Sequence, residues 1–117
     1  MSVFVFGSNL LGIHGAGSAL HARLAHGAEL GIGSGRTGNA YAIPTKRSPR
    51  ADATLSLDQI KEHVATFILY AVAHPELEFE VVQIGCGYAG YKPAQIAPMF
   101  KDAPANCKLP NGWRKPK

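Results

Sequence analysis

The chain has 117 residues, enough for one domain whose core needs no disulfide or metal to hold it together. Hydrophobic residues make up 46% of it, and no apolar run approaches the roughly 18 residues of a membrane span, which excludes a membrane partner. The formal net charge is +4, and the basic residues gather near 46–50 and in the C-terminal tail. A solvated surface, an anionic small ligand or a nucleic acid each accounts for such clusters.

The start of the chain and its cysteines indicate a compartment. Met1 leads straight into an apolar stretch without the basic and hydrophobic regions of a signal peptide, so we expect a cytoplasmic protein. Cys86 and Cys107 are then both expected to be reduced. No spacing of histidine and cysteine fits zinc, and we predict neither a metal nor a cofactor.

The first third of the chain predicts a strand, a loop and a helix. Residues 2–6 (SVFVF) are apolar throughout, as in a parallel strand buried on both faces. After a glycine-rich loop, Ser18 is expected to cap a helix that runs to about residue 26. Leu20 and Leu24 are expected on its buried face, and Gly27 follows as a stop.

A second strand follows a glycine-rich segment. Residues 27–38 contain too much glycine for a regular element, whereas residues 39–46 (NAYAIPTK) predict a strand ended by Pro44. Residues 47–54 are polar and charged, which indicates a loop.

The second half contains the clearest helix, over residues 57–73, where apolar side chains keep a period of 3.6 after a capping box at 56–59. A third strand is expected at 78–85, a helix at 93–101 and a last strand at 106–110.

This alternation predicts an α/β fold with three layers, α/β/α, in which helices cover both faces of a largely parallel sheet. We expect a single domain over residues 1–110 and a basic tail over 111–117. Ligands of such sheets bind at the carboxyl ends of the strands. Because two glycine loops directly follow strands, both are expected at that edge.

The first glycine loop is a candidate phosphate site. Gly15, Ala16, Gly17 and Ser18 precede a helix N-terminus, where free N–H groups favour an anion and glycine lets oxygen atoms approach the backbone. A tight packing turn explains the same residues. Segment 33–38 matches G-x-G-x-x-G but precedes a strand, so it is either a loop that closes over a ligand or a simple connection.

Polar residues beside these loops are further candidates. Asn9 can bind a ribose hydroxyl or form a turn, and His14 can act as a general base or lie idle in its loop. Thr45 and Lys46 end the second strand, where a lysine can bind phosphate, act as a nucleophile or lie on the surface.

The loop after the third strand is the second glycine loop. Gly85, Gly87 and Gly90 allow close approach of a ligand, and Tyr88 or Tyr91 can stack on a base or ribose. Cys86 is either a small buried cysteine or a nucleophile, although the sequence places no histidine partner beside it.

Taken together, these segments resemble a macrodomain, the α/β fold that binds ADP-ribose. Residues 12–19 (GIHGAGSA) look like its glycine loop, residues 41–46 (YAIPTK) like the strand that carries the catalytic lysine of one hydrolase class, and residues 84–87 (IGCG) like the loop against the diphosphate. The likeness covers about residues 3–110 and extends to small macro-like proteins of bacteria and phages.

The resemblance implies a ligand site formed by Asn9, Gly12, Gly15, Ala16, Gly17, Ser18, Thr45, Gly85, Cys86, Gly87, Tyr88, Ala89 and Gly90, with Lys46 and His14 as catalytic residues. In the lysine-using class an aspartate stands where this chain has Ala89. Asp52, Asp58 and Asp102 are candidates to replace it. The resemblance therefore favours binding of ADP-ribose or a related NAD-derived nucleotide over hydrolysis through Lys46. The alternative is a basic accessory protein that binds nucleic acid without catalysis.

Overall fold

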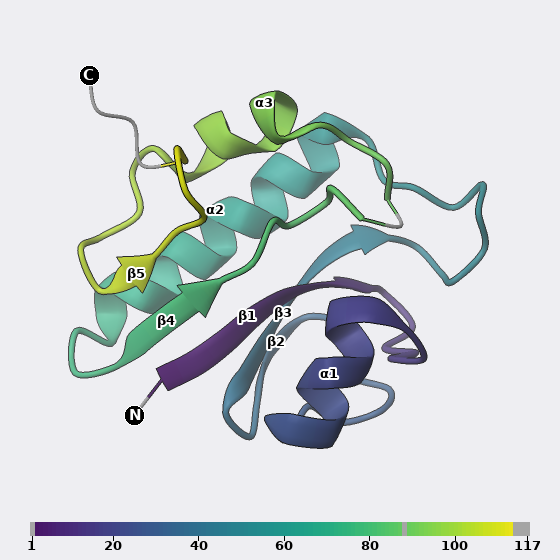
Figure 1. The fold of residues 1–117 in the computed structure, drawn as a ribbon, viewed down its shortest axis with the longest axis horizontal. Helices are drawn as coiled ribbons and strands as arrows, with labels where there is room; N and C mark the ends of the chain where they lie inside the picture. The colour runs from purple at the N-terminus through teal and green to yellow at the C-terminus, as the bar shows by residue number, and fades with distance from the viewer. Residues whose placement is uncertain (1, 88, 114–117) are drawn as a thin grey trace.

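The computed structural model describes residues 2–87 and 89–113. Its centre is a five-stranded sheet in the order β2-β3-β1-β4-β5 (Figure 1). The pairs β1–β3, β1–β4 and β4–β5 are parallel, and only β2 runs antiparallel, to β3. The strands span Ser2–Asn9 (β1), Gly35–Thr37 (β2), Ala40–Lys46 (β3), Glu78–Val81 (β4) and Cys107–Lys108 (β5). The predicted α/β fold with a largely parallel sheet is confirmed.

Helices cover both faces of this sheet, which gives three layers. The helices are Gly17–Ala25 (α1), Leu57–Ala73 (α2) and Pro93–Ile96 (α3), and a 3₁₀ turn over Ala97–Phe100 follows α3. In Figure 1, α1 lies on one face of the sheet and α2 on the other. Along β1, Val3 and Val5 belong to the core under α2, whereas Phe6 belongs to the core under α1. Alternate residues of the central strand are thus buried on opposite faces.

The larger core is built around α2. Ile60, Val64, Phe67 and Ala71 are its buried residues, as their spacing predicts. The capping box at its start is confirmed, because the Ser56 hydroxyl accepts from the Gln59 N–H and the Gln59 side chain accepts from the Ser56 N–H.

The smaller core lies under α1 and differs from the prediction. Ala22 is the buried residue of α1, while Leu24 is 72% exposed. The strand beneath presents Ala40 and Ala42, so the helix lies against small side chains rather than burying a leucine face. Ala16, and not Ser18, is the N-cap, and no side chain caps this helix.

Two further differences concern the strands. Segment 27–38 contains the short strand β2, so part of it is regular after all. Strand β3 continues through Pro44 to Lys46, because β2 pairs only with residues 40–42 and leaves the outer edge of β3 free where proline lacks its N–H.

The C-terminal third is less regular than predicted. Strand β4 ends at Val81, since the Ile84 N–H donates to the Val82 carbonyl at 2.8 Å and turns the chain away from the sheet. The predicted helix at 93–101 becomes a turn of α-helix followed by a 3₁₀ turn, because Pro98 has no N–H for the α-helical pattern.

The folded domain reaches beyond the predicted boundary at residue 110. Trp113 is buried in the larger core, and its ring lies 5.5 Å from that of Phe100. Residues 114–117 of the predicted basic tail lie outside the described residues. Across the described residues, no helix combines the length and the hydropathy that a membrane crossing needs.

Asn106, the residue before β5, forms hydrogen bonds that connect this last strand to the end of α2. Its Nδ2 donates to the carbonyls of Ala71, His74 and Leu77 at 3.2, 3.1 and 3.0 Å. These carbonyls belong to the C-terminal turn of α2 and the segment after it, and their oxygens need a donor.

We expect Asn106→Ala to lower the free energy of unfolding by about 1–3 kcal/mol, since the carbonyls lose their donor. Asn106→Asp should cost more at neutral pH, because a carboxylate then faces carbonyl oxygens. Urea denaturation measures both, with the exposed Asn111→Ala as control. Equal stabilities of all three variants would contradict this role.

Candidate functional site

A cleft of about 660 Å³ opens at the carboxyl ends of the central strands. The end of β1, the N-terminus of α1, the end of β3 and the loop after β4 surround it. The predicted site residues that line it are Asn9, Gly15, Ala16, Gly17, Ser18, Thr45, Lys46, Gly85, Cys86, Gly87 and Ala89. Gly12, His14 and Gly90 do not line it, and Tyr88 lies outside the described residues.

Several lining residues were not predicted. They are Gly7, Ser8, Ile13, Ala19, Pro49, Val82 and Gln83. Most are apolar or small, and three of them, Ser8, Ile13 and Ala19, adjoin a predicted residue in sequence. The signal that could have found the others was their position near the strand ends.

Some glycines of this region serve contact between two backbone segments. A Cβ on Gly12 would lie 2.3 Å from the Gly31 carbonyl carbon, and a Cβ on Gly33 would lie 2.0 Å from the Asn9 carbonyl oxygen. The Gly31 N–H also donates to the Gly12 carbonyl at 2.8 Å. Segment 31–33 is therefore packed onto the end of β1, which favours a fixed connection over a loop that closes on a ligand.

Gly15 and Gly87 have a different environment. A Cβ on either would meet nothing within 4 Å among the described residues, and neither backbone adopts the left-handed conformation that favours glycine. Both line the cleft. Packing within the described chain does not require glycine here, and the absence of a side chain leaves the backbone open to a ligand.

The first turn of α1 faces the same space. Gly17, Ser18 and Ala19 line the cleft, and the N-cap Ala16 offers no side-chain acceptor to their N–H groups. Exposed N–H groups at a helix N-terminus attract an anion because of their partial positive charge.

Asn9 holds the shape of the loop after β1. Its Oδ1 accepts from the Ile13 N–H at 3.1 Å, and its Nδ2 donates to the Ile13 carbonyl at 3.0 Å. The turn-forming interpretation of Asn9 accounts for both bonds. One Nδ2 proton and one Oδ1 lone pair remain for a ligand.

His14 is fully buried and lies away from the cleft lining. Its Nε2 lies 3.1 Å from the Glu29 carbonyl oxygen and 3.2 Å from that of Ile32. Because carbonyl oxygens only accept hydrogen bonds, Nε2 carries the proton. The His14 ring thereby holds segment 29–32 against the loop after β1. This position does not favour the predicted role of His14 as a general base, which stays a prediction, since a catalytic base must reach its substrate.

Lys46 ends β3 with only 8% of its surface exposed, and it lines the cleft. Its Nζ lies 3.4 Å from the Pro49 carbonyl oxygen. No acidic side chain is among the lining residues, and the ion pair found in the described part of the chain joins Arg50 to Asp52. Lys46 is thus a nearly buried cation that forms no ion pair among the described residues, although its charge is the smallest of the causes that lower the pKa of the Asp52 carboxyl.

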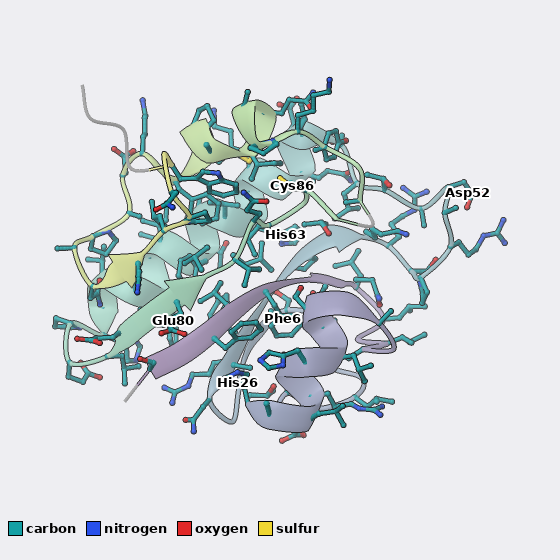
Figure 2. The ribbon with its side chains drawn as sticks, in the orientation of Figure 1. Phe6, His26, Asp52, His63, Glu80 and Cys86 are labelled. Carbon is teal, nitrogen blue, oxygen red and sulfur yellow. The ribbon has the colours of Figure 1, made fainter. Side chains whose placement is uncertain are left out.

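The acids considered as replacements for the missing aspartate lie elsewhere. Asp52 stands at the outer tip of the loop after β3, where it pairs with Arg50 (Figure 2). That arginine holds the pKa of the Asp52 carboxyl below its usual value. Asp58 and Asp102 line a separate groove beside α2 and the 3₁₀ turn.

The second glycine loop is tied to the segment before α2. The Thr54 hydroxyl donates to the Ala89 carbonyl at 3.4 Å, and the Tyr91 hydroxyl donates to the Leu55 carbonyl at 2.7 Å. Tyr91 is thus engaged in holding the loop. Cys86 is partly buried, and burial raises the pKa of its thiol. Cys86 is a free thiol.

Comparison with known proteins adds a fold relative and nothing more specific. No family model matches the chain, and no curated protein matches it. A solved structure described as a protein of unknown function from Bacteroides thetaiotaomicron has a TM-score of 0.64 and 17% sequence identity, covering 93% of this chain and 87% of that one. At this identity the likeness shows that the fold is shared.

The two groups of glycines should respond differently to a methyl group. We expect Gly33→Ala to lower the free energy of unfolding by about 1–3 kcal/mol, because the new Cβ collides with the backbone of Asn9. Gly15→Ala should leave it unchanged or raise it by up to about 1 kcal/mol, because the Cβ meets nothing and alanine restricts the unfolded chain. Thermal and urea denaturation of both variants checks this, and a large loss in Gly15→Ala would mean that packing does require that glycine.

Cys86 should alkylate slowly. Because its pKa is raised by burial, less thiolate is present at neutral pH than for an ordinary thiol, whose pKa is about 8.5. In a Cys107→Ala variant, we expect the rate of reaction with iodoacetamide to rise with pH. The pH at which this rate reaches half its maximum should lie above the ordinary thiol pKa of about 8.5. A midpoint below about pH 8 would contradict the assignment.

Proposed function

We propose that the chain binds ADP-ribose or a related NAD-derived nucleotide in the cleft. One observation carries the proposal: two glycines that packing does not require, Gly15 and Gly87, line the same cavity as Lys46, a nearly buried cation with no acidic side chain beside it in the described lining. A buried charge is costly unless something pairs with it, and an anionic ligand supplies the pair.

The dimensions and lining of the cleft support a nucleotide. Its volume of about 660 Å³ falls in the ordinary range for small-molecule sites. The α1 N-terminus offers backbone N–H groups, which suit a diphosphate, and the backbone at Gly87 is open to the same cleft. Ile13, Val82 and Pro49 provide apolar surface of the kind that a nucleoside covers.

Binding is better supported than hydrolysis. Release of an ADP-ribosyl group calls for an acid or base beside the reacting carbon, and the described lining contains no carboxylate. His14 is buried outside the cleft, so the titratable side chains among the described lining residues are those of Lys46 and Cys86. We therefore assign Lys46 the role of holding a phosphate.

The nucleic-acid alternative has weaker support. Lys46 is directed to the cleft rather than to an open basic surface, and Arg50 is paired with Asp52. Arg47 and Lys108 are exposed, while Arg114, Lys115 and Lys117 lie outside the described residues.

Isothermal titration with ADP-ribose near physiological salt tests the proposal. We expect one nucleotide per chain with micromolar affinity or better, and about a 10- to 100-fold loss in Lys46→Met, which keeps an unbranched side chain only one atom shorter but removes the charge. The same substitution should leave the free energy of unfolding equal or higher, because it removes a nearly buried charge. The exposed Lys61→Met is the matched control and should bind as the wild type does.

Gly15→Val places a branched side chain in the cleft and should abolish binding, whereas Ala51→Val, on the exposed loop after β3, should not. No heat with the wild type, or unchanged binding by Gly15→Val, would contradict the nucleotide site. Affinity for an oligonucleotide that falls steeply with salt and survives Gly15→Val would instead favour the nucleic-acid alternative.

A further inference from the structure

Two histidines, one midway along α1 and one at its C-terminus, turn their ring nitrogens toward each other. His21 lies in the helix and His26 caps its C-terminus. The Nε2 atoms are 3.2 Å apart and the ring centres are 4.9 Å apart. The last residue of α1 that lines the cleft is Ala19; along the helix axis His21 lies about 3 Å and His26 about 10 Å beyond it, and neither histidine lines the cleft. The pair is therefore separate from the site discussed above.

The distance between the nitrogens fits two ligands of one metal ion. Imidazole nitrogens bonded at about 2.0–2.1 Å and about 90–110° apart are separated by about 2.9–3.4 Å. The observed 3.2 Å lies in that range.

Without an ion the two Nε2 atoms lie within hydrogen-bond distance of each other, and the distance between the ring centres indicates whether the rings also converge on one point. Ring centres lie about 1.1 Å behind the nitrogens, so two rings aimed at one ion with this nitrogen separation are about 5 Å apart. Rings that face each other along the line of a hydrogen bond are about 5.4 Å apart. The observed 4.9 Å matches rings that converge on a common point.

The two rings are held in place before any ion arrives. His26 stacks on Phe4 of β1 at 4.5 Å with an angle of 8° between the rings, and His21 meets the same ring edge-on at 5.2 Å. The backbone of His26 is fixed as well, since its N–H donates to Ala22 and its carbonyl accepts from the Asn39 N–H. Figure 2 shows His26 on the face of the sheet that carries α1. Ligands fixed by packing lose little freedom on binding.

We propose that His21 and His26 form a two-histidine site for a late first-row divalent ion, with Cu²⁺ bound most tightly and Ni²⁺ and Zn²⁺ more weakly. Imidazole suits these ions, and Cu²⁺ heads their order of affinity. No cluster of three or more histidine, cysteine or acidic side chains occurs among residues 2–87 and 89–113, so water or an incoming molecule fills the remaining positions. The site is of the open kind rather than the closed kind that supports a fold.

Titration of the untagged, chelator-treated protein with Cu²⁺ tests the site, with the ion followed by calorimetry and by electron paramagnetic resonance. We expect one ion per chain at this site and hyperfine coupling to two nitrogens. His21→Phe and His26→Phe each remove a nitrogen but keep a ring against Phe4, and each should weaken binding at least about tenfold. His63→Ala, which removes a histidine from α2, should leave binding unchanged.

Two results would overturn the proposal. One is wild-type protein that takes up no Cu²⁺. The other is a His21→Phe or His26→Phe variant that binds it as tightly as His63→Ala does. The far-ultraviolet circular dichroism of each variant should match the wild type, so that lost binding is assigned to the missing nitrogen.

Discussion

The contact between the loop after β1 and segment 31–33 is the constraint on which the cleft depends. Backbone meets backbone there, with room for no side chain at Gly12 or Gly33. The Asn9 side chain and the buried ring of His14 fasten the same two segments. This packing sets where the chain leaves β1 and hence where α1 begins. The N-terminus of α1 lies beside Lys46 and the loop after β4 because this packing holds the loop after β1 in one conformation.

The glycines around the cleft thus form two groups: those that close backbone packing requires and those that packing does not require. Gly12 and Gly33 are required by neighbouring backbone, and they belong to the scaffold. Gly15 and Gly87 have open space beside them and line the cleft. A protein under selection only for stability gains from a side chain at such positions, because alanine restricts the unfolded chain. A ligand that approaches the backbone explains why none is present.

Much of the fold could be predicted from the sequence, because its strongest signals are local. The capping box and the 3.6-residue period over 57–73 define α2, and the apolar runs define β1 and β3. Prediction failed where residues distant in sequence but close in space determine burial or the end of a strand. Leu24 is exposed because the alanines under α1 favour Ala22, and Pro44 stays in β3 because its edge is unpaired.

The candidate site shows the same division. Residues at or beyond strand ends, such as Lys46 at the end of β3 and Gly85 in the loop after β4, line the cleft because parallel strands bring their carboxyl ends to one edge. The side chain of His14 could not be placed from its position between two glycines, since its burial depends on carbonyls 15 and 18 residues away. The nitrogens of His21 and His26 meet only because both rings pack on Phe4.

The most direct test of the central claim is the amide spectrum of ¹⁵N-labelled protein titrated with ADP-ribose. Saturable shifts of the Gly15, Gly17 and Gly87 amides are expected, because these N–H groups lie where the diphosphate would bind. The Gly33 amide, packed in the scaffold, should move little. An unchanged spectrum, or shifts confined to the exposed loop at 47–53, would contradict the account of the cleft.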